Sequence, residues 1–172
     1  VSGTLGFSYA GLDLLEGGYV DPSARGPEEL GDLAPFVDTY RAPHPPLGSG
    51  VAAAAAGATA MMDLSDGPAA DARRMAQASG LVIEFDRPAL EAEARLLQVP
   101  AQVCQADPVW WVLQGGEEHG MLASFPPEAV LPEGFRVVGR ARACRDGETP
   151  AAMFDGEVLR GAWDHFDPES VH

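Results

Sequence analysis

The chain alternates short apolar segments with breaks at glycine and proline, and this alternation limits it to a fold built from short elements. None of the segments approaches the roughly 18 consecutive apolar residues that a membrane span requires. The longest simple tract, 52–56, is too short and too weakly apolar to insert into a bilayer. A composition of 46% apolar and 22% charged residues, in a chain of 172, predicts a globular domain with its own core.

Periodicity and capping signals predict helices and strands in mixed order, which favours the α+β class. Helices are expected at 7–16, from Pro27 with an interruption near Pro35, at 67–79 and at 89–99. Strands are expected at 1–4, 58–64, 81–85, 120–125 and 136–143, with a hairpin turn at Asp155-Gly156 within 152–159. The proline-rich segment 41–50 predicts an ordered or extended loop. At least one of Trp110 and Trp111 is expected in the core.

The charge balance excludes some classes of function. The formal net charge is −15, from 26 acidic and 11 basic side chains, and such a surface repels the phosphates of nucleic acids. It is compatible with the collection of divalent metal ions, although an acidic surface also serves solubility alone. Every basic residue other than histidine is arginine, so the chain has no lysine for a Walker-type phosphate loop or a Schiff base.

Cysteine usage and the chain start bear on the cellular setting. Cys104 and Cys144 stand apart without metal-type spacing, and we expect reduced, partly buried thiols. The first residues lack the basic patch and apolar stretch of a signal peptide, so we expect a soluble cytoplasmic protein without a membrane segment. The chain opens on Val1 rather than methionine, so we expect a fragment, a processed chain or one piece of a longer protein.

The strongest local signal is the run 61–67, in which Asp63, Ser65 and Asp66 follow an apolar segment. We expect a buried strand that delivers these side chains at its C-terminal end, directly before a helix. Magnesium prefers hard oxygen ligands and often binds one or two carboxylates together with substrate phosphates, and a helix N-terminus favours phosphate oxygens. The run therefore predicts a metal and nucleotide-phosphate site. The alternative is helix capping by Ser65 or Asp66, with the other acid favouring the helix dipole.

A second signal is the Gly-Gly-Glu-Glu-His run at 115–119. Paired glycines allow a tight turn or the close approach of a ligand, and the carboxylate of Glu117 beside them could bind a cationic substrate. The alternative is a turn with solvated acids. Near the end of the chain, Trp163 could stack on a flat cationic ring, or it could anchor the core. The four histidines share no spacing and match no catalytic-triad motif.

An ordered set of segments resembles the thiamine-monophosphate kinase family. In chain order these segments are 1–6, 40–46, 58–67, 115–117, 125–127, 138–140 and 163–166. No single segment is diagnostic, but their order and approximate spacing fit along nearly the whole chain. The family is part of a larger group that includes aminoimidazole ribonucleotide synthetase.

The resemblance implies a fold for residues 1–172. This fold is the C-terminal domain of the aminoimidazole ribonucleotide synthetase-like architecture, an α+β domain with a mixed or antiparallel sheet packed with helices. In the family, an N-terminal domain forms much of a homodimer and supplies most of the acidic ligands for ATP and magnesium. That domain is expected to be absent from this chain.

The resemblance also implies roles for individual residues. Asp63 and Asp66 are expected to bind Mg²⁺, and Ser65 to contact the co-substrate ATP. Glu117 and Trp163 are expected to hold thiamine phosphate, whose thiazolium ring carries a permanent positive charge. The implied reaction is in-line phosphoryl transfer from ATP to thiamine monophosphate, giving thiamine diphosphate. Such chemistry depends on positioning and charge neutralisation, so we nominate no catalytic nucleophile.

Departures from the family pattern limit these expectations. Glu118 stands where the family usually has aspartate, and its longer side chain could move a contact. Pro68 replaces the usual leucine, which a first helical turn tolerates. Because the N-terminal acidic ligands are missing, we expect the fragment alone to be inactive. Two other interpretations stay open: a sister ATP-using enzyme acting on another phosphorylated substrate, and a non-catalytic binding module.

Overall fold

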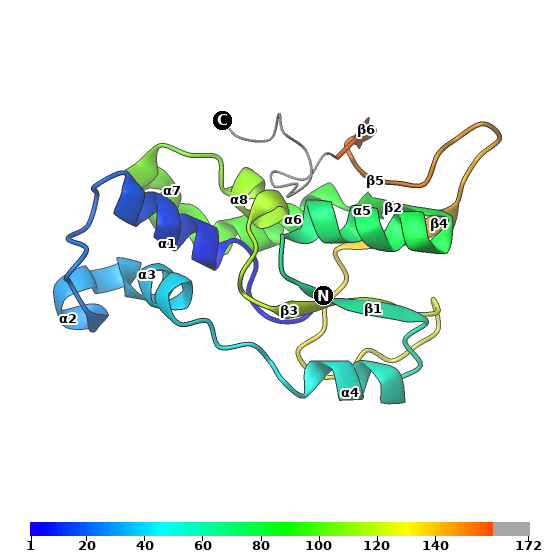
Figure 1. The fold of residues 1–172 in the computed structure, drawn as a ribbon, viewed down its shortest axis with the longest axis horizontal. Helices are drawn as coiled ribbons and strands as arrows, with labels where there is room; N and C mark the ends of the chain where they lie inside the picture. The colour runs from blue at the N-terminus through cyan, green and yellow to red at the C-terminus, as the bar shows by residue number, and fades with distance from the viewer. Residues whose placement is uncertain (160–172) are drawn as a thin grey trace.

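Two small β-sheets and a group of short helices make up the fold (Figure 1). The computed structural model describes residues 1–159. Its helices are α1 (Phe7–Glu16), α2 (Gly26–Leu30), α3 (Ala34–Arg41), α4 (Ser49–Ala55), α5 (Pro68–Ser79), α6 (Arg87–Ala94), α7 (Gln98–Cys104) and α8 (Pro108–Gln114), with 3-10 segments at Gly31–Leu33 and Arg95–Leu97. Its strands are β1 (Ala60–Leu64), β2 (Leu81–Phe85), β3 (Gly120–Ser124), β4 (Gly139–Ala143), β5 (Ala151–Phe154) and β6 (Glu157–Val158). None of the helices within residues 1–159 has the length and apolar content that a bilayer crossing requires.

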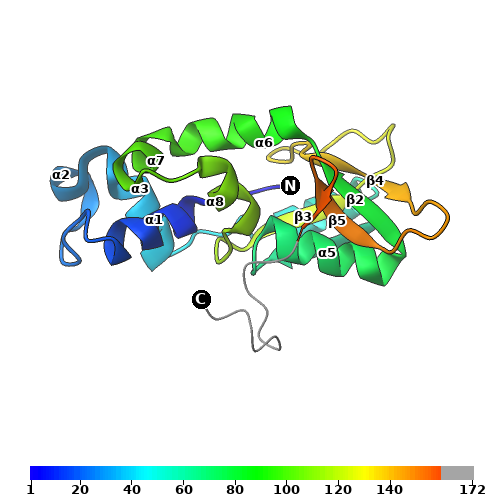
Figure 2. The ribbon, with the colours of Figure 1, turned by 90° about the horizontal axis from the view of Figure 1, so that it is seen from above.

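The strands form two separate sheets. β1 and β3 pair antiparallel, with Leu64 opposite Gly120 and Ala60 opposite Ser124. The larger sheet has the order β4-β2-β5-β6, in which β2 and β5 are parallel and the other neighbours antiparallel. Helix α5 packs along one face of this sheet, against β2 and β5 (Figure 2). The chain therefore passes from the small sheet to the large one through α5.

Helix α5 begins and ends at residues whose conformations suit those positions. Pro68 stands in the first turn, where its missing N–H removes no helical hydrogen bond. Gly80 ends the helix in the left-handed conformation, with φ of 66°. The buried face carries Ala69, Ala72 and Ala76. These small side chains allow the helix axis to approach the sheet closely.

A helical layer forms the other end of the molecule (Figure 1). Helix α1 packs against α3, α7 and α8. The rings of Phe7 in α1 and Phe36 in α3 have centroids 4.8 Å apart. Leu14, Val37 and Trp111 are buried between these helices. Helices this short are marginal alone, so burial of these apolar faces is what stabilises them.

Several sequence predictions are confirmed. The helix at 7–16 and the strand at 81–85 have the predicted bounds. The hairpin between β5 and β6 turns at Asp155 and Gly156, which have φ of 52° and 82°, as a primed two-residue turn requires. Of the adjacent tryptophans, Trp111 is buried and Trp110 is exposed, so one lies in the core as expected.

The strand expected at 1–4 is wrong. The structure has a single bridge between Ser2 and Met121 there. Gly3 follows with φ of 79°, a left-handed conformation that turns the chain away from β3.

Other element boundaries also differ from the predictions. The loop expected at 41–50 ends before α4, which starts at Ser49 and uses the alanine-rich tract as a helix. Pro35 lies in the first turn of α3 and so starts a helix rather than interrupting one. The helix predicted at 89–99 is divided by the 3-10 segment Arg95–Leu97.

The neighbouring tryptophans provide a test of this core. Trp111 is 1% exposed, and its Nε1–H donates a 2.7 Å hydrogen bond to Oδ2 of Asp13, whereas Trp110 is 52% exposed. We expect Trp111→Ala to lower the free energy of unfolding by about 3–5 kcal/mol, because it leaves a cavity. The matched Trp110→Ala should cost less than about 1 kcal/mol. Urea denaturation measures both, and equal losses would contradict this packing.

Candidate functional site

Two loops meet at one end of the small sheet. One follows β1 and spans 65–67, and the other precedes β3 and spans 115–119. Because β1 and β3 are antiparallel, with Leu64 opposite Gly120, the end of one strand lies beside the start of the other. The pairing therefore brings together residues from two separate sequence signals: Asp63, Ser65, Asp66 and Glu117.

Direct backbone contact holds the two loops together. The N–H of Glu117 donates a 2.9 Å hydrogen bond to the carbonyl oxygen of Ser65. A Cβ atom on Gly116 would overlap that same carbonyl oxygen. Gly67 has φ of 93° and ψ of 160°, a region open essentially to glycine alone, and an added Cβ would lie 2.7 Å from the carbonyl oxygen of Gln114. Glycine is therefore required on both sides of the contact.

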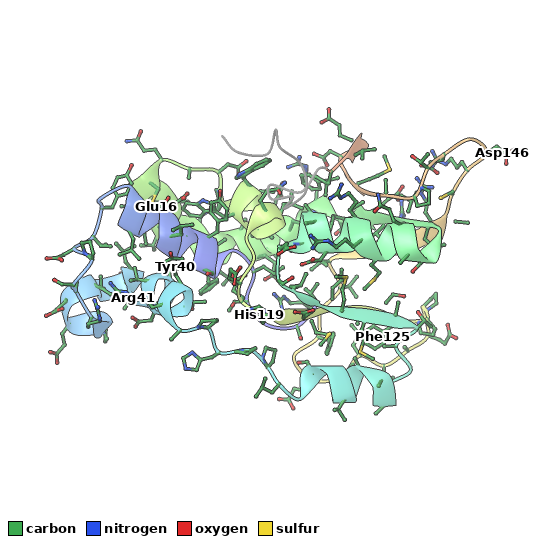
Figure 3. All side chains as sticks on the ribbon, viewed as in Figure 1. Glu16, Tyr40, Arg41, His119, Phe125 and Asp146 are labelled. Atoms are coloured by element: carbon green, nitrogen blue, oxygen red, sulfur yellow. The ribbon has the colours of Figure 1, made fainter. Side chains whose placement is uncertain are left out.

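The end of β1 and the loops 65–67 and 115–119 form a small platform, on which two carboxylates face solvent. The side chain of Asp63 is 61% exposed and that of Glu117 is 74% exposed. His119 lies between them, with Nδ1 3.7 Å from Oδ2 of Asp63 and Nε2 3.7 Å from Oε2 of Glu117. Figure 3 labels His119 near β3. The two acids form an open, negatively charged edge that suits a cationic ligand.

The strand that carries Asp63 is more exposed than predicted. Leu64 is buried, but Met61 and Asp63 are exposed, so the expectation of a buried strand is wrong for β1. Exposure alternates along the strand, so Leu64 lies on the face toward the interior, whereas Met61 and Asp63 lie on the face toward solvent. The exposure leaves Asp63 accessible to ligands.

Asp66 has a more enclosed environment. Its Oδ2 lies 2.5 Å from Nη2 of Arg74, and its backbone N–H donates a 3.0 Å hydrogen bond to Oδ2 of Asp71. The N-cap position of α5 is Gly67, which has no side chain to accept a capping hydrogen bond. The helix-capping interpretation of Ser65 and Asp66 is therefore wrong. An ion pair, rather than a helix end, holds the carboxylate of Asp66.

Glu118 points into the protein instead of toward the site edge. It is 5% exposed, and its Oε1 accepts a 3.0 Å hydrogen bond from the backbone N–H of Ser8 in the first turn of α1. Burial raises the pKa of Glu118 from 4.5 to about 7, although backbone N–H groups at the start of α1 act in the opposite direction. The side chain that departs from the family pattern thus ties the Glu117 loop to α1.

The carboxylates of Asp63 and Asp66 fit a partial magnesium site. Both are hard oxygen donors, and a magnesium ion bound together with phosphates needs only one or two protein carboxylates. Within residues 1–159, no group of three His, Cys, Asp or Glu side chains is arranged to hold a metal ion. A metal ion held by these two carboxylates would need phosphate oxygens or further ligands to complete its coordination shell.

One predicted site residue lies outside the described residues, and two residues beside Asp66 were not predicted. Trp163 lies outside the described residues, so its predicted role stays a prediction. Arg74 and Asp71, which contact Asp66, were not identified from the sequence. A usable signal was present, because residues three apart on a helix share one face, and the first turn of α5 lies beside Asp66.

A hollow of about 460 Å³ opens at the opposite end of β3 from His119. The lining is mainly apolar and includes Phe85, Leu122, Phe125, Leu131 and Phe135. Its charged lining residues are Arg136 and Arg140, and it includes no predicted site residue. Because metal binding needs carboxylates, the two acidic loops and not this hollow form the candidate site.

Comparison with known proteins places the chain in a family context. No family model matches the chain. Over 153 residues it is 40% identical to the thiamine-monophosphate kinase of Mycobacterium tuberculosis, an alignment that covers 86% of this chain and 42% of that protein. The chain is homologous to the C-terminal part of a thiamine-monophosphate kinase. The thiamine-monophosphate kinase of Corynebacterium glutamicum is 38% identical over 157 residues, which cover 87% of this chain and 44% of that relative.

Solved thiamine-monophosphate kinase structures share the fold. The structure from Aquifex aeolicus superimposes with a TM-score of 0.67 and 28% identity, over 92% of this chain and 49% of that one. A structure of AaThiL complexed with AMPPCP and TMP gives a TM-score of 0.65 and 25% identity, over 96% of this chain and 50% of the other. The resemblance and the α+β, aminoimidazole ribonucleotide synthetase-like fold predicted from sequence are confirmed. The chain spans about half the length of the thiamine-monophosphate kinases it matches.

The buried carboxyl of Glu118 predicts a pH dependence of stability. Between its ordinary pKa of 4.5 and about 7, the folded protein holds a proton that the unfolded chain has released. Stability therefore falls as the pH rises through this window, and the cost of ionising Glu118 reaches roughly 3 kcal/mol above it. Glu118→Gln removes this contribution, so its free energy of unfolding relative to wild type should increase from pH 5 to pH 8.

Urea denaturation at the two pH values measures the difference between variant and wild type. Glu128→Gln, at an exposed carboxylate, is the matched control and should show the same pH slope as wild type. A Glu118→Gln variant that also follows the wild-type slope would show that Glu118 ionises at its ordinary pKa.

Proposed function

We propose that the protein containing this chain is a thiamine-phosphate kinase, an Mg-dependent enzyme that phosphorylates thiamine monophosphate to thiamine diphosphate with ATP as co-substrate. The observation that carries the proposal is the meeting of two acidic loops, one with Asp63 and Asp66 and the other with Glu117. Homology to thiamine-monophosphate kinases along most of the chain supports it. So does the relative of the same fold that is complexed with AMPPCP and TMP.

The loop after β1 is proposed to serve the nucleotide. Asp63 and Asp66 would hold Mg²⁺, and Ser65 between them would contact ATP. When bound, magnesium would bridge and neutralise phosphate oxygens. Asp63 is open to solvent and Asp66 is held by Arg74, so one carboxylate is accessible while the other is already oriented.

The loop before β3 is proposed to serve thiamine phosphate. The carboxylate of Glu117 would attract the positive thiazolium ring, and Trp163 would stack on that ring. The exposure of Glu117 supports this role, because a ligand can reach it without a rearrangement of the core. The short distance between the two loops would place the acceptor phosphate near the nucleotide.

The proposed chemistry needs no covalent intermediate on this chain. In-line transfer requires that the acceptor phosphate and the terminal phosphoryl group of ATP be held in line. It also requires that the repulsion between their negative charges be reduced. The backbone contact between the loops supports the first requirement, because it fixes Glu117 relative to Ser65. The carboxylates and their cation would meet the second.

Several features of the whole protein belong to the proposal as well. An N-terminal domain would supply the remaining acidic ligands and form most of a homodimer, since this chain covers about half of its relatives. We also propose a cytoplasmic location, where ATP is available. The net charge of −15 argues against nucleic acid as a partner.

The metal role of Asp66 can be tested in the full-length protein. We expect Asp66→Asn to lower kcat for ATP-dependent thiamine diphosphate formation by roughly 100-fold or more, because a neutral amide is a poor magnesium ligand. Glu128→Gln, which removes a negative charge from an exposed position away from the two loops, should retain wild-type activity. Near-normal activity of Asp66→Asn would reject the metal role, and a wild-type protein inactive on thiamine phosphate would reject the kinase assignment.

The isolated 172-residue chain is expected to form no thiamine diphosphate. By this proposal it would contribute two carboxylates to a site that needs more ligands, and it spans about half the length of its relatives. A coupled assay with purified chain, ATP, Mg²⁺ and thiamine phosphate measures this directly. The full-length protein in the same assay is the positive control, and turnover by the chain alone would show that it carries a complete site.

A further inference from the structure

We propose that Arg74 makes the site bind the metal–nucleotide complex in preference to the free metal ion. The inference rests on the proposed function and concerns a residue that none of the predicted site roles includes. Arg74 lies in the second turn of α5, the helix that follows the loop carrying Asp66. It acts as a positioning residue for the carboxylate that would bind magnesium.

The guanidinium of Arg74 joins two acids. Its Nη2 is 2.5 Å from Oδ2 of Asp66, and its Nη1 is 2.6 Å from Oδ1 of Asp71. Both are short, direct contacts between opposite charges. An arginine guanidinium is always protonated in proteins, so Arg74 is a fixed positive charge beside both carboxylates.

Asp71 anchors this arrangement inside the protein. Its side chain is 0% exposed, and its Oδ2 also accepts the backbone N–H of Asp66 at 3.0 Å. Loss of Arg74 from Asp71 would leave a buried carboxylate without its counter-charge, which is costly. Arg74 therefore stays with Asp71 when another cation approaches Asp66. An ordinary surface ion pair has no such anchor and contributes little.

The ion pairs of Arg74 with Asp66 and Asp71 set an order of preference among ligands. A free divalent cation must compete with the guanidinium for Oδ2 of Asp66 and is repelled by its charge. A metal–nucleotide complex meets the opposite situation, because its phosphate oxygens carry net negative charge. The Arg74 side chain is 39% exposed, so the solvent-facing edge of its guanidinium can face those phosphate oxygens while Asp71 binds the buried edge. The same side chain thus opposes the free cation and favours the complex.

Binding measurements on the full-length protein test the proposal without an activity assay. Mn²⁺ binding without nucleotide is followed by electron paramagnetic resonance, and binding of Mg·AMPPCP by calorimetry. For Arg74→Gln we expect the Kd for Mn²⁺ to fall about 3- to 10-fold and the Kd for Mg·AMPPCP to rise about 10-fold. Arg95→Gln, at an exposed arginine on another element, should change neither.

Arg74→Lys provides a second variant in case the glutamine form fails to fold. Lysine keeps the charge but cannot bridge two carboxylates with a planar fork, so the same two shifts should occur with smaller size. The opposite direction of the two shifts is the decisive result. If Arg74 has a purely structural role, its loss would weaken the binding of both ligands. If Arg74 forms only a passive surface ion pair, its loss would leave both Kd values unchanged. Either outcome overturns the inference.

The proposed function fails in a different way. If the wild-type protein itself does not bind Mg·AMPPCP, the kinase assignment is rejected and the inference is rejected with it. If the wild type binds and the variants do not show opposite shifts, only the role of Arg74 is rejected.

Discussion

The antiparallel pairing of β1 with β3 is the interaction on which the candidate site depends. It places the end of one strand against the start of the other, so two loops that are distant in sequence share one small platform. The platform is closed by backbone contact, with Glu117 bonded to Ser65 and glycine at Gly67 and Gly116. Without that pairing, the acids of the two loops would have no fixed relation to each other.

The two magnesium-binding candidates differ in how the fold treats them. Asp63 is exposed beside His119, whereas Asp66 is tied to Arg74 and, through its backbone, to the buried Asp71. This asymmetry follows from position, since Asp63 lies on the exposed face of β1, whereas Asp66 lies beside the start of α5. One acid is therefore oriented in advance, while the other can adapt to the ligand.

Sequence signals with a local physical cause predicted their elements well. The helix predicted at 67–79 does end at Ser79, before the left-handed Gly80, and Asp155-Gly156 forms the predicted hairpin, because these conformations are specified by the residues themselves. Signals that depend on distant neighbours were less informative. The exposure of β1 could not be predicted without its partner, and nothing local indicated that Glu118 would turn inward toward α1 while Glu117 faced solvent. Local runs indicated the candidate site residues and the resemblance gave them specific roles, while the structure added Asp71 and Arg74 beside Asp66.

The glycine contact between the loops also has a consequence for the evolution of specificity. Where main chains touch directly, no side chain sets the spacing, so substitution cannot gradually widen or narrow the platform. Variation is confined to groups that project outward from it, such as His119 and Glu117. A lineage could therefore exchange those outward groups to accept a different ligand and inherit the backbone frame intact.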